Sequence, residues 1–291
     1  MDERIAQLVE QYRAGALSRR EFLARLVLIT GSLATASALL ASLGLGDEAQ
    51  GAQVPPDAPD LTSSTLQYPS GSVTMSGYLA RPRAAGEYPG LIVIHQNTGL
   101  NNHIQDVARR FAREGYVALA PDLLSRAGGT GQYATPQDAI AAIGKLTDDQ
   151  VVQDLHATFA HLKLQPGVQA RRIGIIGYCW GGQRSFLFGV STPELAAVVV
   201  YYGQRPAPID RVQNLAGAFL GIYAERDERI TSLVPEVEAA LKRYNKPYEI
   251  KIYPGTVHAF FDDTRPDRYH PGAAREAWPQ TLRFLTRHLK G

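Results

Sequence analysis

The stretch RIGIIGYCWGG, residues 172–182, decides the fold and raises the question of what the chain's only cysteine does. The apolar run 172–178 predicts a buried strand, and GGQRSFLFGV, residues 181–190, predicts a helix directly after it. Cys179 therefore lies in a predicted strand-to-helix turn, flanked by glycines.

Strands and helices alternate on both sides of this turn. Continuous apolar runs are typical of strands buried on both faces, and apolar residues at helical spacing predict helices. Because helices between strands make parallel crossovers, we expect an α/β fold with a doubly wound, mostly parallel sheet and helices on both faces. The predicted strands are 72–82 at an edge, 90–96, 116–123, 172–178, 196–203, 217–224 and 248–254, and the predicted helical regions are 102–115, 136–165, 181–190, 231–244 and 272–289.

The composition and net charge of the chain are those of an ordinary globular protein. The chain has 291 residues, a formal net charge of +2 and 45% hydrophobic residues, which fits one globular domain with a large core. So small a charge excess gives no reason to expect a nucleic-acid partner. One cysteine cannot form an internal disulfide, and the seven histidines show no metal-binding spacing, so neither a metal nor a cofactor is predicted.

The N-terminal residues 1–46 read as an export signal. Arg19 and Arg20 are followed by Phe22, and an uncharged stretch runs from Leu26 to Gly46. Paired arginines before a moderately apolar region resemble a twin-arginine signal, so we expect the twin-arginine export machinery as a partner and a periplasmic or extracellular location. The alternative is an uncleaved membrane anchor, in which this segment alone contacts the membrane.

Behind this segment, the Pro-rich residues 47–66 are predicted to be a linker, and 67–291 a folded domain.

A lone cysteine is often only a small buried hydrophobe. Here its position favours chemistry, because Gly177 to Gly181 reads G-x-C-x-G, the nucleophile elbow G-x-S-x-G with sulfur in place of oxygen. Glycines suit a strained turn in which side chains would collide with backbone. The helix N-terminus behind Cys179 also lowers the pKa of a thiol.

The elbow requires an acid and then a base later in the chain. His258 follows the predicted strand 248–254, and Asp227 follows 217–224. Glu225 competes with Asp227, but it lies nearer the strand end and has a longer side chain, so we prefer Asp227.

The motifs GYCWGG, ERD and GTVHAFF, with LIVIHQNTGLNNHIQDVARRFAREGYVALAPDLL upstream, resemble the dienelactone hydrolase family over about residues 70–288. The resemblance implies an α/β-hydrolase catalytic domain over 67–291 that hydrolyses an ester or lactone through an acyl-thioester. It implies that Cys179 is the nucleophile, that His258 is the base and that Asp227 orients it.

An oxyanion hole is expected beside Cys179. The backbone N–H of Trp180 is one predicted donor, and that of Asn97, in the loop after strand 90–96, is the second. Trp180, Tyr202 and Gln96 are predicted to line the substrate pocket, although ordinary core packing would equally explain the first two.

Two positions depart from the family pattern. The family usually has a glutamate where this chain has Gln96, and a neutral amide cannot repel a thiolate, so we expect a standing thiolate on Cys179 paired with a protonated His258. Where archetypal members carry an arginine after the histidine, this chain has Asp262. That carboxylate favours a neutral ester or lactone as substrate.

Arg126 and Arg205 are candidates to compensate for the missing arginine, and the Gly-rich segment 125–136 with the helical region 136–165 is predicted to form a cap over the site. Two other functions remain open. One is a catalytically silent α/β-hydrolase scaffold that serves as an exported binding module, and the other is a thioesterase or acyltransferase.

Overall fold

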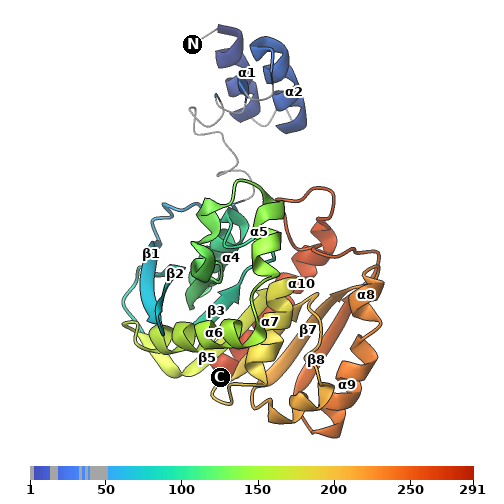
Figure 1. Ribbon diagram of the computed structural model, residues 1–291. Coiled ribbons are helices and arrows are strands. Elements are labelled where there is room, and N and C mark those ends of the chain that lie inside the picture. The colour runs from blue at the N-terminus through green and yellow to red at the C-terminus, as the bar shows by residue number, and fades with distance from the viewer. Residues whose placement is uncertain (1–2, 14–18, 33–34, 37–38, 40–51) are drawn as a thin grey trace. The chain divides into compact units, whose positions relative to one another are not determined.

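The computed structural model describes residues 3–13, 19–32, 35–36, 39 and 52–291. It divides into two compact units, Met1–Ala52 and Gln53–Gly291. In the first unit, helices α1 (Glu3–Arg13) and α2 (Arg19–Thr30) lie side by side (Figure 1). They pack together through apolar side chains: Ile5, Leu8, Val9, Phe22 and Leu26. Among the described residues, no helix has the length and apolarity needed to cross a membrane. Much of the predicted export signal lies outside the described residues, so export and anchoring stay predictions.

The second unit is built on one eight-stranded sheet with strand order β1-β2-β4-β3-β5-β6-β7-β8. β2 pairs antiparallel with β1 and β4, and every other neighbouring pair is parallel. The predicted mostly parallel, doubly wound sheet is confirmed. The strands are β1 (Leu61–Ser70), β2 (Val73–Pro82), β3 (Tyr88–Ile94), β4 (Val117–Asp122), β5 (Val168–Tyr178), β6 (Ala197–Tyr201), β7 (Ala218–Ala224) and β8 (Tyr248–Tyr253).

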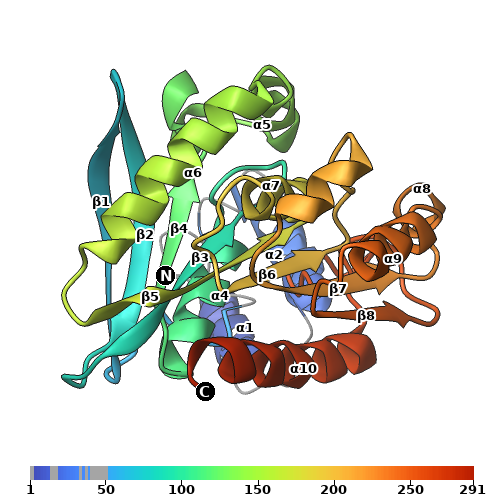
Figure 2. The ribbon, with the colours of Figure 1, turned by 90° about the horizontal axis from the view of Figure 1, so that it is seen from below.

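Helices cover both faces of this sheet. Apolar residues of α4 and α10 join one core cluster, and those of α6, α7 and α9 join the other. Figure 2 shows α10 along one face and α6 along the opposite one. The helices of this unit are α4 (Asn102–Arg113), α5 (Pro136–Ile143), α6 (Asp148–Lys163), α7 (Trp180–Gly189), α8 (Glu228–Thr231), α9 (Val234–Arg243) and α10 (Pro271–Leu289).

The linker predicted over 47–66 is wrong for its last six residues. Residues 61–66 belong to β1, which pairs with β2 along its whole length, so β1 and not 72–82 is the edge strand. The strand could not be recognised in the sequence, because an edge strand with one solvent-exposed face is rich in serine and threonine. Val54 is also tied down: its N–H donates to Asp106 Oδ1 at 2.8 Å, and its carbonyl accepts from Arg109 at 2.6 Å. Residues 47–51 lie outside the described part of the chain.

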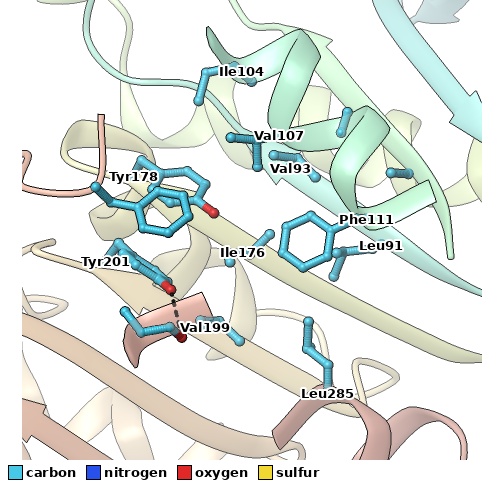
Figure 3. Packing of buried hydrophobic residues seen from close by; sticks show 14 of the residues in the cluster. Leu91, Val93, Ile104, Val107, Phe111, Ile176, Tyr178, Val199, Tyr201 and Leu285 are labelled. Atoms are coloured by element: carbon cyan, nitrogen blue, oxygen red, sulfur yellow. Dashed lines mark hydrogen bonds between the residues drawn. The ribbon is translucent and has the colours of Figure 1, made fainter. Parts of the chain in front are cut away.

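The central strands are buried on both faces, as their continuous apolar runs predict. Leu91 and Val93 of β3 join the cluster under α4 and α10, whereas Ile92 and Ile94 join the opposite one. Figure 3 shows the first cluster, where Tyr178 at the end of β5 packs on Tyr201 of β6, with ring centroids 4.8 Å apart. The last residue before Cys179 is therefore fixed by close packing on a rigid sheet.

Candidate active site

The turn at residues 177–181, the elbow, joins β5 to α7 in a strained conformation. Cys179 has a backbone φ of +58°, a value that residues other than glycine rarely adopt. A Cβ on Gly177 would lie 1.9 Å from the Gly181 carbonyl oxygen, and one on Gly181 would lie 2.3 Å from the His95 carbonyl oxygen. The predicted strand-to-helix turn is confirmed, and its glycines are required by contact with backbone.

The structure brings the three predicted catalytic residues together at the carboxyl edge of the sheet. Asp227 follows β7, and His258 lies on the loop after β8. His258 Nδ1 forms a short hydrogen bond with Asp227 Oδ2, and the ring also hydrogen-bonds to the Cys179 thiol. Glu225, the competitor for Asp227, instead accepts from the Gly255 N–H at 2.8 Å and is exposed.

These contacts shift both titrating groups. Burial by itself would lower the pKa of His258, but its hydrogen bonds to Asp227 and Cys179 outweigh burial and raise it to about 9. Burial would raise the pKa of the Cys179 thiol, yet the hydrogen bond to His258 and that residue's charge bring it below its ordinary value. Both directions favour a thiolate–imidazolium pair.

Two backbone amides face the sulfur. The N–H groups of Trp180 and Asn97 both hydrogen-bond to Cys179 and help to lower the pKa of its thiol. They are the two donors that the sequence nominates for the oxyanion hole, one from the elbow and one from the loop after β3. Their convergence beside one sulfur gives the site an anion-binding corner.

The two departures from the family pattern form a single contact, which the sequence analysis missed. Gln96 Nε2 donates to Asp262 Oδ2 at 2.7 Å, and both side chains are 2% exposed. Asp262 Oδ1 accepts from the N–H and hydroxyl of Thr264 at 3.1 and 2.6 Å. Because 166 positions separate Gln96 from Asp262 and neither belongs to a local motif, nothing in the sequence pointed to their pairing.

Cys179 borders two cavities. One, of about 770 Å³, is lined by Cys179, His258, Gln96 and Asp262 and by the segment 130–140, so this part of the predicted cap is confirmed. The other, of about 390 Å³, also borders Cys179 and His258 and is lined by Trp180 and Tyr202. All three predicted pocket residues therefore line a cavity, although Tyr202 is also fully buried in the core.

The rest of the predicted cap and the compensating arginines lie elsewhere. Helix α6 packs on the sheet through Leu155 and Leu162 instead of covering the site. Arg126 is held by Asp154 at 2.7 Å, and Arg205 by Glu236 at 2.7 Å. The arginines that line the larger cavity are Arg229, Arg265 and Arg268.

One group of described residues has metal-like spacing. His103, Asp262 and Asp263 offer ligand atoms within 4.8 Å of one another. The Arg110 guanidinium is 2.5 Å from Asp263, so an internal cation already pairs with that carboxylate. Burial would raise the pKa of Asp263, but His103 and Arg110 hold it below its ordinary value. The donor set fits a structural hydrogen-bond network better than a metal centre.

Comparison with known proteins gives a consistent result. A family model described as "Dienelactone hydrolase family" matches residues 75–289. A Synechocystis protein named "Putative carboxymethylenebutenolidase" is 35% identical over 246 residues, which span 79% of this chain and 99% of that protein. A Yersinia pestis protein of the same name is 34% identical over 232 residues, which span 76% of this chain and 86% of that protein.

A solved structure agrees with these relatives. The Klebsiella pneumoniae protein named "Putative Dienelactone Hydrolase" superposes with a TM-score of 0.72 at 32% identity, and the match covers 78% of this chain and 98% of that one. The predicted fold class, the α/β-hydrolase fold, is confirmed.

Proposed function

The chain belongs to the dienelactone hydrolase family of carboxylic ester hydrolases, and we propose that it hydrolyses a small ester or lactone through an acyl-thioester on Cys179. The observation that carries the proposal is the hydrogen-bonded line from Cys179 through His258 to Asp227, beside two convergent amides. A nucleophile, a base and an orienting carboxylate in that order form a catalytic triad.

The first half-reaction forms the thioester. The Cys179 thiolate attacks the carbonyl carbon, and the developing oxyanion accepts hydrogen bonds from the Trp180 and Asn97 amides, each worth roughly 3 kcal/mol in comparable enzymes. The tetrahedral intermediate then collapses and its C–O bond breaks. The His258 imidazolium gives its proton to the departing alkoxide. The resulting neutral alcohol leaves as the first product of an ester and stays attached to the acyl chain of a lactone.

The second half-reaction releases the acid. Neutral His258 takes a proton from a water molecule as that water attacks the thioester carbonyl. The new intermediate expels the thiolate and leaves the acid product, and the Cys179–His258 ion pair is restored. Throughout, Asp227 holds the Nδ1 proton of His258 and stabilises the imidazolium.

The charges around the thiol suggest a neutral acyl group. Asp262 is a buried carboxylate that lines the larger cavity, and an anionic acyl group beside it would be repelled. Arg229, Arg265 and Arg268 line the same cavity and are the groups that an anion elsewhere on the substrate would meet. Comparing kcat/KM for a neutral lactone and its carboxylated analogue tests this, and a preference for the carboxylated one would contradict it.

The deciding experiment is hydrolysis of a neutral chromogenic ester by residues 47–291, with Cys179→Ala as control. This fragment keeps the whole unit Gln53–Gly291 with its own core. Activity in the parent but not in the variant supports the proposal. Folded, reduced parent protein without activity would favour the silent scaffold, and an ester product formed only when an alcohol is added would favour acyl transfer.

We also propose export by the twin-arginine route, which rests on the sequence alone. Arg19 and Arg20 stand ahead of an uncharged stretch. Replacing both with lysine should leave the protein inside the cell while the parent is exported, as measured by fractionation. Equal export of both proteins would reject the proposal.

A further inference from the structure

His95 is a fully buried histidine, next to the active site, that the proposed reaction does not use. Its Nε2 lies 3.1 Å from the Leu123 N–H, which donates to it. Nε2 is therefore unprotonated, and the proton of the neutral ring is on Nδ1. Nδ1 donates to the Gln96 carbonyl oxygen at 2.6 Å. Because burial lowers the pKa of His95, the ring keeps this neutral tautomer.

The Gln96 carbonyl and the Asn97 N–H belong to one peptide group. A trans peptide is planar, so its C=O and N–H point in opposite directions. A hydrogen bond that holds the carbonyl therefore also aims the N–H. The Asn97 N–H is one of the two amides that reach the Cys179 sulfur.

His95 also contacts the residue that supplies the second amide. Its ring stacks on the Trp180 indole, with centroids 5.7 Å apart and planes 14° apart. The elbow itself lies against the same backbone, since a Cβ on Gly181 would approach the His95 carbonyl to 2.3 Å. One side chain thus contacts both halves of the anion-binding corner.

We propose that His95 is a positioning residue that aims the Asn97 amide at the oxyanion and braces Trp180 beside it. The inference rests on the proposed ester hydrolysis, because an oxyanion forms only in that reaction. The two nitrogens of the His95 ring have separate roles. Nε2 anchors the histidine to the Leu123 backbone, and the Nδ1 proton orients the peptide between Gln96 and Asn97.

The two nitrogens can be tested separately. In His95→Asn, the amide nitrogen occupies about the place of Nδ1 and keeps the donor to Gln96. In His95→Gln, the amide reaches the place of Nε2 and keeps only the contact with Leu123. His161→Asn is the matched control, since His161 lies on α6 and contacts Gln165.

We expect His95→Gln to lower kcat by about 10- to 100-fold with KM within about threefold, a smaller loss than removal of a whole oxyanion donor causes. We expect His95→Asn to recover most of kcat, and the control to match the parent. The pH dependence of iodoacetamide labelling gives a second readout, because a misdirected Asn97 amide should raise the pKa of the Cys179 thiol in His95→Gln.

Two results would overturn the proposal. One is a His95→Gln protein with unchanged kcat and unchanged labelling. The other is an equal loss of activity and thermal stability in His95→Asn and His95→Gln with the thiol pKa unmoved, which marks a purely structural role. Should His95→Gln not fold, His95→Ala replaces it in the comparison with His95→Asn. If the parent itself hydrolyses no ester, the proposed function fails, but labelling still decides whether His95 aims the amide.

Discussion

Two corners of the larger cavity, one at Cys179 and one at Asp262, differ in the groups that surround the charged residue. At the first, Cys179, His258 and Asp227 form a line of ionisable groups in which the pKa of the thiol is lowered and that of the imidazole is raised. At the second, the carboxylate of Asp262 is held by Gln96, a neutral amide that cannot change its charge. The first corner can move protons, whereas the second places a buried carboxyl group beside it.

This difference separates the residues that would carry out the reaction from those that would select the substrate by its charge. Proton transfer needs groups whose pKa values are shifted toward one another, and the first corner supplies them next to the sulfur. A carboxylate satisfied by Gln96 and Thr264 instead sets the charge that a substrate meets. Changes at the first corner should therefore abolish turnover, and changes at the second should tune it.

The largest effect is expected at the nucleophile. Cys179→Ala removes the atom on which we propose that the thioester forms, so kcat should fall by about 10⁵-fold or more, as for other triad nucleophiles. Stability should change little, because the thiol is only partly buried. Single-turnover kinetics and a thermal unfolding scan measure both. Residual turnover above about one per cent would place the chemistry on another group.

A slightly smaller loss is expected from Asp227→Asn. An amide leaves the geometry intact but favours the wrong tautomer of His258, which should lower kcat by about 10⁴-fold. Glu225→Gln is the matched control, because Glu225 follows the same strand and binds the Gly255 amide instead. Reversed effects in the two variants would assign the acid of the triad to Glu225.

The pH dependence of kcat/KM should follow the pKa values of Cys179 and His258. His258 has a pKa raised to about 9 and Cys179 a lowered one, so the ion pair exists between the two values. As pH falls through the thiol pKa, the nucleophile is protonated and kcat/KM declines. As pH rises through about 9, His258 loses the proton that the leaving alkoxide needs, and kcat/KM declines again. A profile with its alkaline limb near 6.5, the ordinary value for histidine, would contradict the strong coupling.

The residues of the first corner could be predicted from the sequence because each of them has a local signature. The motif G-x-C-x-G identifies Cys179 as the candidate nucleophile. The order of the strands after it points to Asp227 as the candidate acid and His258 as the candidate base. The continuous apolar runs likewise predicted the parallel core. Strand β1 could not be predicted, because its solvent-exposed face is as polar as a linker. The Gln96–Asp262 contact could not be predicted either, because long-range pairing leaves no periodic signal in the sequence.

The smallest expected effect probes the second corner. In Gln96→Glu, two buried carboxyl groups would share a site at hydrogen-bond distance, and both cannot ionise. One must take up a proton, so the free energy of unfolding at pH 8 should fall by about 1–3 kcal/mol and kcat by about tenfold.

The double variant Gln96→Glu/Asp262→Asn separates this repulsion from simple loss of shape. It restores one carboxylate and one amide with their positions exchanged, so most of the stability should return, and a double-mutant cycle gives the coupling. The exchanged charge would then lie on residue 96, in the same loop as the Asn97 amide, and should oppose the thiolate more strongly. Iodoacetamide labelling should accordingly report a higher thiol pKa in the double variant than in the parent. Full stability with an unchanged thiol pKa would mean that the location of this charge in the cavity does not matter, and the contrast between the two corners would lose its basis.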